Sequence, residues 1–312
     1  MRNYITVDGG TTTTRISLVQ DMQLKDTIKL GVGARANMEQ PGLLEKELKG
    51  AIESLLTKHA LSEADITRIL ASGMITSEFG LCKLDHIQTP AGLTELHDSM
   101  FETVISEISS VPFVFVRGVK TDATDFRDTD MMRGEEVELM GIINPDYGKC
   151  IYILPGSHSK VIQTDAQGRI VDFSTMLTGE MIASLSQNTI LKDAVDLTIS
   201  ETDAEYLLKG YDCCENAGVN KALFKTRILK NIYGCTAKQT YSFFIGVVLH
   251  DELVEINKAD TETIVLGGKA QIKEAMALIL NRRCDKKLVV LSENDVSSCT
   301  AKGIIKIYEG EK

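Results

Sequence analysis

The sequence predicts an α/β protein in which two halves repeat one order of elements. In the first half, a turn rich in glycine and threonine separates two apolar segments, residues 4–7 and 15–20. In the second half, residues 150–177 again read as strand, glycine turn, strand, turn, strand. The two turns lie about 150 residues apart, which is the size of one domain. We therefore predict one domain in each half.

The remaining elements of the first half follow from their own patterns. Residues 24–30 read as a third strand, and residues 41–60 carry apolar residues at helical spacing with charges on the other face. Residues 66–77 indicate a strand that runs into a glycine loop. A second helix around residues 93–109 is expected to lead into an apolar strand at 111–119.

The second half is richer in helices. Residues 132–143 are predicted to be helical, and the chain reads as mainly helical from residue 178 to about residue 256. The stretch TETIVLGGKAQIKEAMALIL, residues 261–280, predicts a strand, a Gly-Gly pair and a helix. One further strand and a last helix complete the pattern.

Composition and charge exclude several classes of protein. The chain of 312 residues has 43% hydrophobic and 25% charged residues, which is ordinary globular composition. Its net charge of −10 argues against nucleic acid or an anionic membrane as the main partner. No window approaches the roughly 18 apolar residues of a membrane span, and a strand pattern begins at once, without a signal peptide. We expect a cytoplasmic protein that binds neither nucleic acid nor membrane.

The cysteines and histidines do not predict a metal site. Seven cysteines are scattered without a C-x-x-C pair, and the five histidines show no ligand spacing. This distribution is typical of reduced cytosolic thiols. A disulfide framework, a zinc site or another metal with soft ligands is not expected.

The turn of the first half, in VDGGTTTTRISLVQ, has two interpretations. The chain lacks the P-loop motif and the G-x-G-x-x-G fingerprint, and the residues after Thr14 alternate like a strand, so the turn closes a hairpin. Successive amides at a hairpin tip form a nest for an anion, to which threonine hydroxyls add donors. Asp8, at the end of an apolar strand, is suited to Mg²⁺, which prefers oxygen ligands. A surface hairpin with Asp-Gly turn chemistry explains the same residues equally well.

Two other glycine turns leave similar alternatives open. In LPGSHSK, residues 154–160, the small and basic side chains can hold an anion, while His158 is more simply a hydrogen-bonded structural histidine. In VLGGKA, residues 265–270, the glycines would let a flat base or a phosphate approach the backbone. An ordinary tight turn fits that stretch as well.

The run DTDMMRGEEVELMG, residues 128–141, gathers five carboxylates at the start of a predicted helix. The helix dipole favours negative charge in the first turn, so the carboxylates alone do not indicate a site. Arg133 is the only cation in the run. Its guanidinium can bind a carboxylate or a phosphate with two bonds, and it is therefore a candidate for ligand binding.

Together these stretches resemble the 2-dehydro-3-deoxygalactonokinase family, within the superfamily of sugar kinases, Hsp70 and actin. The shared motifs follow the family's order over nearly the whole chain: ASGMITS (71–77), PAGL (90–93), MRGEE (132–136), LPGSHSK (154–160) and TGE (178–180). The resemblance implies an α/β fold of two ribonuclease-H-like lobes, as in actin-like ATPases, with ATP and a sugar acid in a central cleft. The lobes are expected at residues 1–125 and 126–312.

The resemblance also implies an activity, the ATP-dependent phosphorylation of the terminal hydroxyl of 2-dehydro-3-deoxy-D-galactonate to its 6-phosphate in galactonate catabolism. The alternatives are a kinase of the same superfamily for another sugar or amino sugar, and a non-catalytic sugar-acid sensor. The partner is then a small-molecule sugar acid, and the cofactors are ATP and Mg²⁺. A homodimer is a candidate assembly.

Site residues follow from the same resemblance. The ATP side is implied to comprise two phosphate loops and an adenosine turn: Asp8, Gly9, Gly10, Thr11, Thr12 and Thr13, then Gly156, Ser157, His158 and Lys160, then Gly267 and Gly268. Asp8 is the implied Mg²⁺ ligand. The sugar-acid side is implied to comprise Arg15, Gly73, Met74, Ile75, Ala91 and Gly92. The predicted catalytic residues are Asp130 as the base, Arg133 and Glu135, with Asp128 and Glu136 as rivals of Asp130.

Overall fold

In the computed structural model, which describes residues 2–268 and 270–310, the chain divides into two units. Unit 1 comprises Met1–Asp146, Gln167–Asp172 and Asn294–Lys312, and unit 2 comprises Tyr147–Ala166 and Phe173–Glu293. By contacts, residues 126–146 and 294–312 thus group with unit 1. The division into lobes at 1–125 and 126–312 stays a prediction.

Unit 1 is built on a six-stranded sheet in the order β3-β2-β1-β4-β7-β6. β1 pairs antiparallel with β2 and parallel with β4, and β4 pairs parallel with β7. The strands are β1 (Asn3–Gly9), β2 (Thr14–Gln20), β3 (Gln23–Leu30), β4 (Arg68–Gly73), β6 (Phe101–Thr103) and β7 (Phe113–Phe115).

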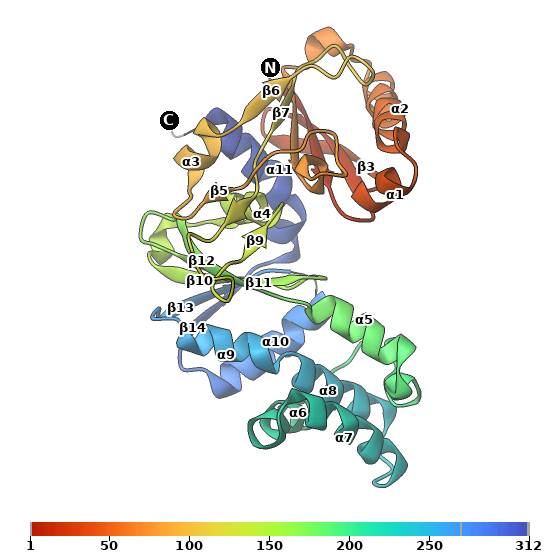
Figure 1. Cartoon of the computed structure of the whole chain (residues 1–312), viewed down its shortest axis with the longest axis vertical. Coiled ribbons are helices and arrows are strands. Elements are labelled where there is room, and N and C mark those ends of the chain that lie inside the picture. The colour runs from red at the N-terminus through yellow and green to blue at the C-terminus, as the bar shows by residue number, and fades with distance from the viewer. Residues whose placement is uncertain (1, 269, 311–312) are drawn as a thin grey trace. The chain divides into compact units, whose positions relative to one another are not determined.

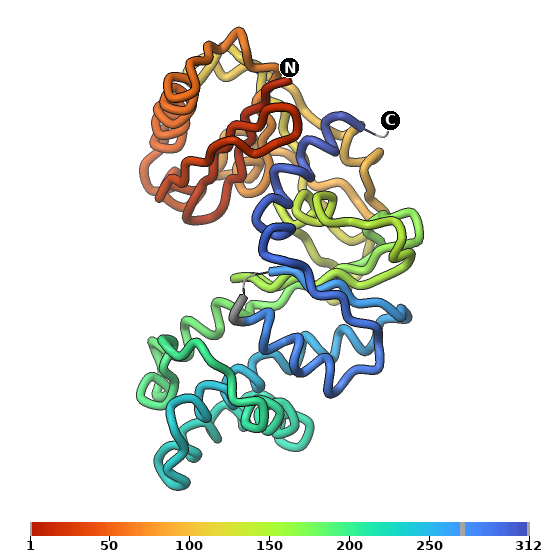
Figure 2. Tube along the Cα trace, turned by 180° about the vertical axis from the view of Figure 1, so that it is seen from behind, coloured from red at the N-terminus to blue at the C-terminus, as the bar shows by residue number. Residues whose placement is uncertain are grey.

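The alternation of side chains along β1 separates the two faces of this sheet. Ile5 and Val7 point to a buried core with Leu44 and Leu48 of the helix α2 (Leu43–Lys58), which follows the short helix α1 (Ala34–Glu39). The opposite face of β1 lies against the last helix, α11 (Glu293–Glu309), where the rings of Tyr4 and Tyr308 meet edge to face at 5.7 Å. Figure 2 shows α11, in blue, beside the N-terminal strands, in red. Asp8 therefore faces α11 rather than the apolar core.

The predicted helix at 93–109 is wrong in its second half. The helix α3 (Leu93–Asp98) ends early, the hydroxyl of Ser99 donates to the carbonyl of Leu96, and the chain continues as β6. β6 pairs antiparallel with β7 at the edge of the sheet. Aromatic and β-branched residues such as Phe101 and Thr103 favour this strand, so pairing overrides the helical spacing.

The carboxylates of residues 128–141 also do not all lie at the start of one helix. A small sheet in the order β5-β8-β9 contains β5 (Ile87–Gln88), β8 (Val119–Lys120) and β9 (Met131–Met132), and the helix α4 (Glu135–Ile142) begins only after Gly134. Asp128 and Asp130 thus precede a strand. The first turn of α4 contains Glu135 and Glu136.

Unit 2 contains a five-stranded sheet in the order β12-β11-β10-β13-β14, with an extended helical part (Figure 1). Its strands are β10 (Cys150–Leu154), β11 (Ser159–Thr164), β12 (Ile170–Met176), β13 (Thr263–Leu266) and β14 (Lys287–Val290). The first three residues of β12 are assigned to unit 1. Its helices are α5 (Thr178–Asn188), α6 (Ala204–Ala217), α7 (Val219–Asn231), α8 (Ala237–Val248), α9 (His250–Lys258) and α10 (Ala270–Arg283). α8 is buried along most of its length because α6 and α7 pack against it.

The two sheets share one topology. In each, a meander of three strands is followed by further strands, three in unit 1 and two in unit 2, and the first strand of the meander pairs parallel with the fourth strand. This order confirms the predicted ribonuclease-H-like fold of both halves. The central cleft stays a prediction. No helix within the described ranges is long and apolar enough to cross a membrane.

Candidate active site

The hairpin tip between β1 and β2 presents backbone amides, while three of its carbonyl groups accept hydrogen bonds from the protein. The amide of Gly10 donates to the carbonyl of Thr13 at 2.9 Å. The first amides of α1 bind two further carbonyl groups, since Ala34 donates to Gly10 at 3.1 Å and Arg35 to Thr11 at 3.0 Å. Within residues 2–268 and 270–310, no protein acceptor is bound by the amides of residues 11–13. A tip with free amides and exposed threonine hydroxyls suits an anion.

Asp8 lies beside this tip and faces Arg15 across the two strands. Arg15 Nη1 is 3.0 Å from Asp8 Oδ2, and the Asp8 side chain is 26% exposed. Burial raises the pKa of the Asp8 carboxyl above its ordinary value, and the Arg15 guanidinium opposes that rise. Asp8 borders a small cavity of about 60 Å³, together with the polar residues Ser72 on β4 and Thr300 on α11 and with apolar residues such as Ile304.

The donor set at Asp8 fits a hard cation. The Ser72 hydroxyl is fully buried and has no hydrogen-bond partner among the described residues, and it lines the same cavity as the carboxylate. Mg²⁺ prefers oxygen ligands, keeps several waters and needs only one or two carboxylates. In the described part of the chain, no group of three His, Cys, Asp or Glu residues is placed to hold a metal ion. A single carboxylate beside the hydroxyl groups of Ser72 and Thr300 is compatible with water-mediated Mg²⁺ binding.

Three glycines bring the ends of β1, β4 and the start of α4 together. A Cβ atom on Gly73 would lie 2.5 Å from the carbonyl oxygen of Gly9, and Gly73 has a φ of 82°. A Cβ atom on Gly9 would lie 2.8 Å from that of Ile75, and one on Gly134 would lie 3.5 Å from Gly73 Cα. Gly9 and Gly73 are therefore required for close backbone packing, and Gly134 is favoured by its φ of 111°, whether or not a ligand touches them.

Two of the predicted sugar-acid residues follow Gly73. The Met74 side chain is half-buried, whereas the Ile75 side chain is buried and cannot contact a ligand. Ile75 is 1% exposed and packs in the core of unit 1, and its carbonyl accepts from the amides of Leu81 and Cys82. Ala91 is fully buried and exchanges two backbone hydrogen bonds with Ile170. These contacts point to structural roles for the side chains of Ile75 and Ala91.

Gly92 is likewise committed to local structure. Its amide donates to the Glu95 carboxylate at 2.8 Å, which caps the start of α3. A Cβ atom on Gly92 would lie 2.7 Å from the Arg169 side chain. Its part in binding a sugar acid stays a prediction.

Arg133 is held at the glycine loop by residues that the sequence pattern did not single out. Its Nη1 donates to the Thr76 hydroxyl at 2.8 Å, and its Nη2 donates to the carbonyl of Leu84 at 2.7 Å and lies 3.4 Å from His86 Nδ1. Burial lowers the pKa of the Arg133 guanidinium. Burial and Arg133 together lower the pKa of His86 to about 4, so this histidine is neutral at pH 7. The guanidinium is thus oriented, with donors left over for a carboxylate or a phosphate.

The candidate carboxylates differ in their surroundings. Asp130 is half-buried, and its Oδ1 accepts from the Met131 amide at 2.6 Å. Glu135 is half-buried, whereas Glu136 is fully buried and both of its oxygens accept from the Gly134 amide, at 2.9 and 2.8 Å. Burial and the neighbouring Glu135 raise the pKa of Glu136 to about 8. Glu136 therefore caps the start of α4 and is shielded from any ligand in this conformation.

The second glycine loop, in unit 2, is backed by the TGE turn at the start of α5. The amide of Gly179 donates to the carbonyls of Gly156 at 3.2 Å and Ser157 at 3.1 Å, and the amide of Glu180 donates to Ser157 at 3.3 Å. Ser157 itself is exposed, and His158 Nε2 lies 3.0 Å from Glu180 Oε1. Lys160 is buried. Amides at the start of α5 therefore fix the loop, and the loop is exposed to solvent at Ser157.

The Gly-Gly pair after β13 lies directly beside this loop. The amide of Gly267 donates to the carbonyl of Ile153 at 2.9 Å. Gly268 has a φ of 84°, and a Cβ atom on it would lie 2.6 Å from Pro155 Cδ. The structure thus joins two of the predicted ATP-side segments, which are more than a hundred residues apart in the sequence.

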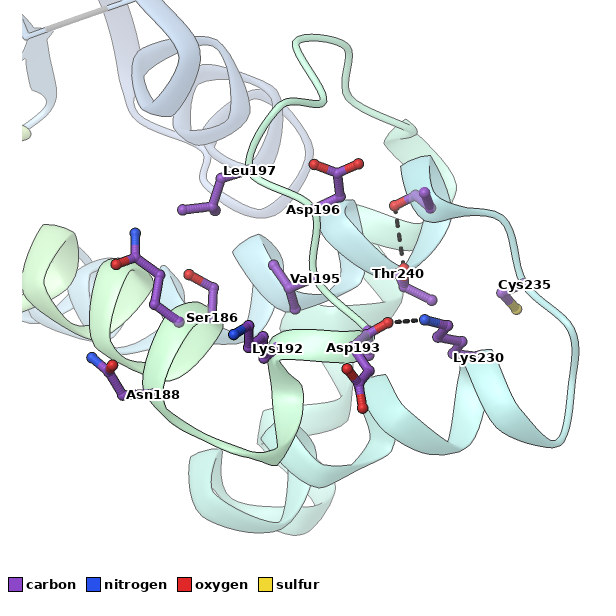
Figure 3. A pocket seen from close by; sticks show the side chains of 13 residues that line it. Ser186, Asn188, Lys192, Asp193, Val195, Asp196, Leu197, Lys230, Cys235 and Thr240 are labelled. Carbon is purple, nitrogen blue, oxygen red and sulfur yellow. Dashed lines mark hydrogen bonds between the residues drawn. The ribbon is translucent and has the colours of Figure 1, made fainter.

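A larger cavity of about 790 Å³ lies elsewhere in unit 2, among residues of α5, α7 and α8 (Figure 3). Several of its polar groups already have protein partners. Lys230 Nζ donates to the carbonyl of Asp193, the Thr240 hydroxyl donates to the carbonyls of Thr236 and Ala237, and the Ser186 hydroxyl donates to that of Ile182. None of the predicted site residues lines it.

The chain is similar to known proteins over most of its length. The model of the family described as 2-keto-3-deoxy-galactonokinase matches residues 8–307. The 2-dehydro-3-deoxygalactonokinase of Escherichia coli (strain K12) is 24% identical over 257 residues, which are 81% of this chain and 80% of that one. The protein of Rhizobium meliloti (strain 1021) named probable 2-dehydro-3-deoxygalactonokinase DgoK1 is 32% identical over 152 residues. That match covers 47% of each chain, about half of the relative's length.

A solved structure is similar in fold. The crystal structure of a Sinorhizobium meliloti protein, described as a candidate 2-dehydro-3-deoxygalactonokinase, superposes with a TM-score of 0.78 at 20% identity. The alignment covers 97% of this chain and 95% of that one. At this identity the similarity concerns the fold.

Proposed function

This chain belongs to the 2-keto-3-deoxy-galactonokinase family, and we propose that it transfers the γ-phosphoryl group of ATP to the terminal hydroxyl of 2-dehydro-3-deoxy-D-galactonate. The product is the 6-phosphate of that sugar acid, in galactonate catabolism. The observation that carries the proposal is the family match over residues 8–307, which includes every predicted site residue. The two anion-suited glycine loops, one in each unit, support it.

The chain's own residues account for the binding steps of this reaction. The amides of the tip at 10–13 and the open side of the loop at 156–157 are donors for phosphate oxygens, and Gly267 and Gly268 leave room for the adenosine. Mg²⁺, which Asp8 would hold through water, neutralises charge on the phosphates when it is bound. Arg133, fixed by Thr76 and Leu84, is oriented to bind the substrate carboxylate or the transferred group. A carboxylate near the acceptor hydroxyl takes its proton as the new bond forms.

The assembly and the compartment are part of the same proposal. A homodimer stays a prediction, which light scattering at several protein concentrations would test. The free cysteines of the described residues support a reducing, cytoplasmic compartment.

The activity is tested by following ADP release with Mg·ATP and a panel of acceptors. We expect turnover with 2-dehydro-3-deoxy-D-galactonate, little with its C4 epimer, and none above background with glucose or an amino sugar. Turnover with a neutral hexose alone would refute the substrate and favour the alternative kinase. Tight binding of the sugar acid without any ADP release would favour the sensor.

The catalytic base is tested with carboxamide variants. We expect Asp130→Asn to lower kcat by about 10²- to 10⁴-fold, the usual contribution of a general base. Asparagine keeps an oxygen that can accept from the Met131 amide, so the local backbone and the Kd for ATP should be unchanged. Glu135→Gln and Asp128→Asn are the matched comparisons. Near-full activity of Asp130→Asn together with a large loss in Glu135→Gln would move the base to Glu135.

A further inference from the structure

A carboxyl group without an assigned role is buried behind the second glycine loop. Glu252, on α9, is fully buried, whereas Asp251 beside it is exposed. It lies on the inner face of the helix with Leu253 and Ile256. A buried ionisable group is costly unless it forms hydrogen bonds, so its contacts indicate what it does.

Two hydroxyl groups converge on this carboxyl. The Thr178 hydroxyl donates to Glu252 Oε1, and the Ser159 side chain is close enough to lower the pKa of the carboxyl. The second oxygen, Oε2, is buried and has no hydrogen-bond partner among the described residues. Thr178 is the first residue of α5, and Ser159 is the first residue of β11. Glu252 thus contacts both segments that flank the loop at 155–160.

Ser159 and the segment of Thr178 each contact the backbone of the loop at 155–160. The Gly156 amide donates to Ser159 Oγ at 3.3 Å. On the other side, Gly179 follows Thr178 directly and donates to the carbonyls of Gly156 and Ser157. A Cβ atom on Gly179 would lie 2.6 Å from the Gly156 oxygen, so the contact is close. The orientation of the loop therefore depends on where Thr178 and Ser159 are held.

We propose that Glu252 is a positioning residue for ATP, which fixes the second phosphate loop through Ser159 and Thr178. The inference rests on the proposed function, because it takes the loop at 155–160 to bind the ATP phosphates. Glu252 touches no ligand itself, since it is fully buried. A leucine at this position would avoid the burial of a carboxyl, so the hydrogen bond from Thr178 and the polar contact with Ser159 are what the glutamate supplies.

The electrostatics of the site agree with this assignment. Burial raises the pKa of Glu252 to about 7, and the hydroxyl groups of Thr178 and Ser159 oppose that rise. A large part of the population is therefore uncharged at neutral pH. Glutamine resembles the protonated form in shape and keeps one acceptor oxygen, so it is the conservative replacement.

The test compares Glu252→Leu and Glu252→Gln by calorimetric binding of ATP and by steady-state kinetics. We expect Glu252→Leu to weaken ATP binding and raise the KM for ATP by about 30-fold, the loss expected for a buried hydrogen-bonded network. The Kd for the sugar acid should change less than twofold, because its predicted residues lie in unit 1. Glu252→Gln should stay within about fivefold of the wild type. Glu255→Gln, on the same helix in a surface pair with Lys258, is the matched control and should not change ATP binding.

Two further variants keep the test decisive if Glu252→Leu fails to fold. Ser159→Ala and Thr178→Val each remove one hydroxyl, and each should weaken ATP binding by about fivefold. Unchanged ATP affinity in a folded Glu252→Leu protein, or in both hydroxyl variants, overturns the inference. Equal losses of ATP and sugar-acid affinity would indicate general destabilisation and would also overturn it. A wild-type protein that binds ATP but does not phosphorylate the sugar acid refutes the proposed function alone.

Discussion

Asp8→Asn should lower kcat for phosphoryl transfer by about 10³-fold while the sugar acid still binds. The carboxylate is the proposed Mg²⁺ ligand beside the hairpin tip, and Arg15 at 3.0 Å opposes its protonation. Asparagine keeps the size and one oxygen but removes the charge that faces the cation. Removal of one preorganised electrostatic group usually costs about 10²- to 10³-fold in kcat. The measurement is single-turnover kinetics over a range of Mg²⁺ concentrations, in which the variant should require far more Mg²⁺.

Asp98→Asn is the control for this variant. Asp98 is an exposed carboxylate in the same unit, on α3, and its replacement should leave both kcat and the Mg²⁺ dependence unchanged. A loss in Asp8→Asn that high Mg²⁺ does not reduce, together with a weakened Kd for the sugar acid, would contradict the assignment. Asp8 would then be a structural partner of Arg15.

Glu136→Gln should change the pH dependence of stability more than any other single substitution that we consider. The pKa of Glu136 is raised from 4.5 to about 8. A raised folded-state pKa contributes stability that is fully present below pH 4.5 and is lost as the pH rises through about 8. At about 1.4 kcal/mol per pH unit, the loss is on the order of 4 kcal/mol. Glutamine cannot ionise and does not incur this loss.

Thermal unfolding at several pH values tests this expectation. At pH 5 the variant should be slightly less stable than the wild type, because glutamine has one oxygen for the Gly134 amide where glutamate has two. By about pH 8.5 it should be more stable, so that the difference in Tm rises by on the order of 10 °C across this range. The titrations of His86 and Glu252 occur in both proteins and cancel in the difference. Glu53→Gln, at an exposed position of α2, should give a constant difference. Parallel curves for Glu136→Gln and the wild type would mean that Glu136 titrates normally.

Local patterns predicted most of the fold and the glycine loops of the candidate site. The two meanders follow from strand periods of two residues around turns of glycine, serine and threonine, and both were correct. The helix at 93–109 was wrong because its second half pairs with β7, a contact that no local pattern reveals. The position of Asp130 was misjudged for a similar reason, since β9 is a strand only through pairing with β8.

The residues that contact Arg133 could not be predicted from the sequence. Thr76 and His86 are 57 and 47 residues away from it in the chain, and neither belongs to a motif that predicts such a contact. Glu252 is different, because helical spacing places it on one side with Leu249, Leu253 and Ile256. A glutamate on an apolar helical face is a signal that the sequence itself contains, and a buried carboxyl can be predicted from it.

The close packing of Gly9 against Gly73 has a consequence for how mutational data on this protein are to be interpreted. A side chain at either position would meet backbone or core atoms within 3 Å. A saturation scan will therefore mark both positions as intolerant, with the same score as positions that bind a ligand. Intolerance at these glycines reports the spacing between two strands. Only positions whose substitution alters ligand affinity at unchanged stability should be counted as contacts with ATP or the sugar acid.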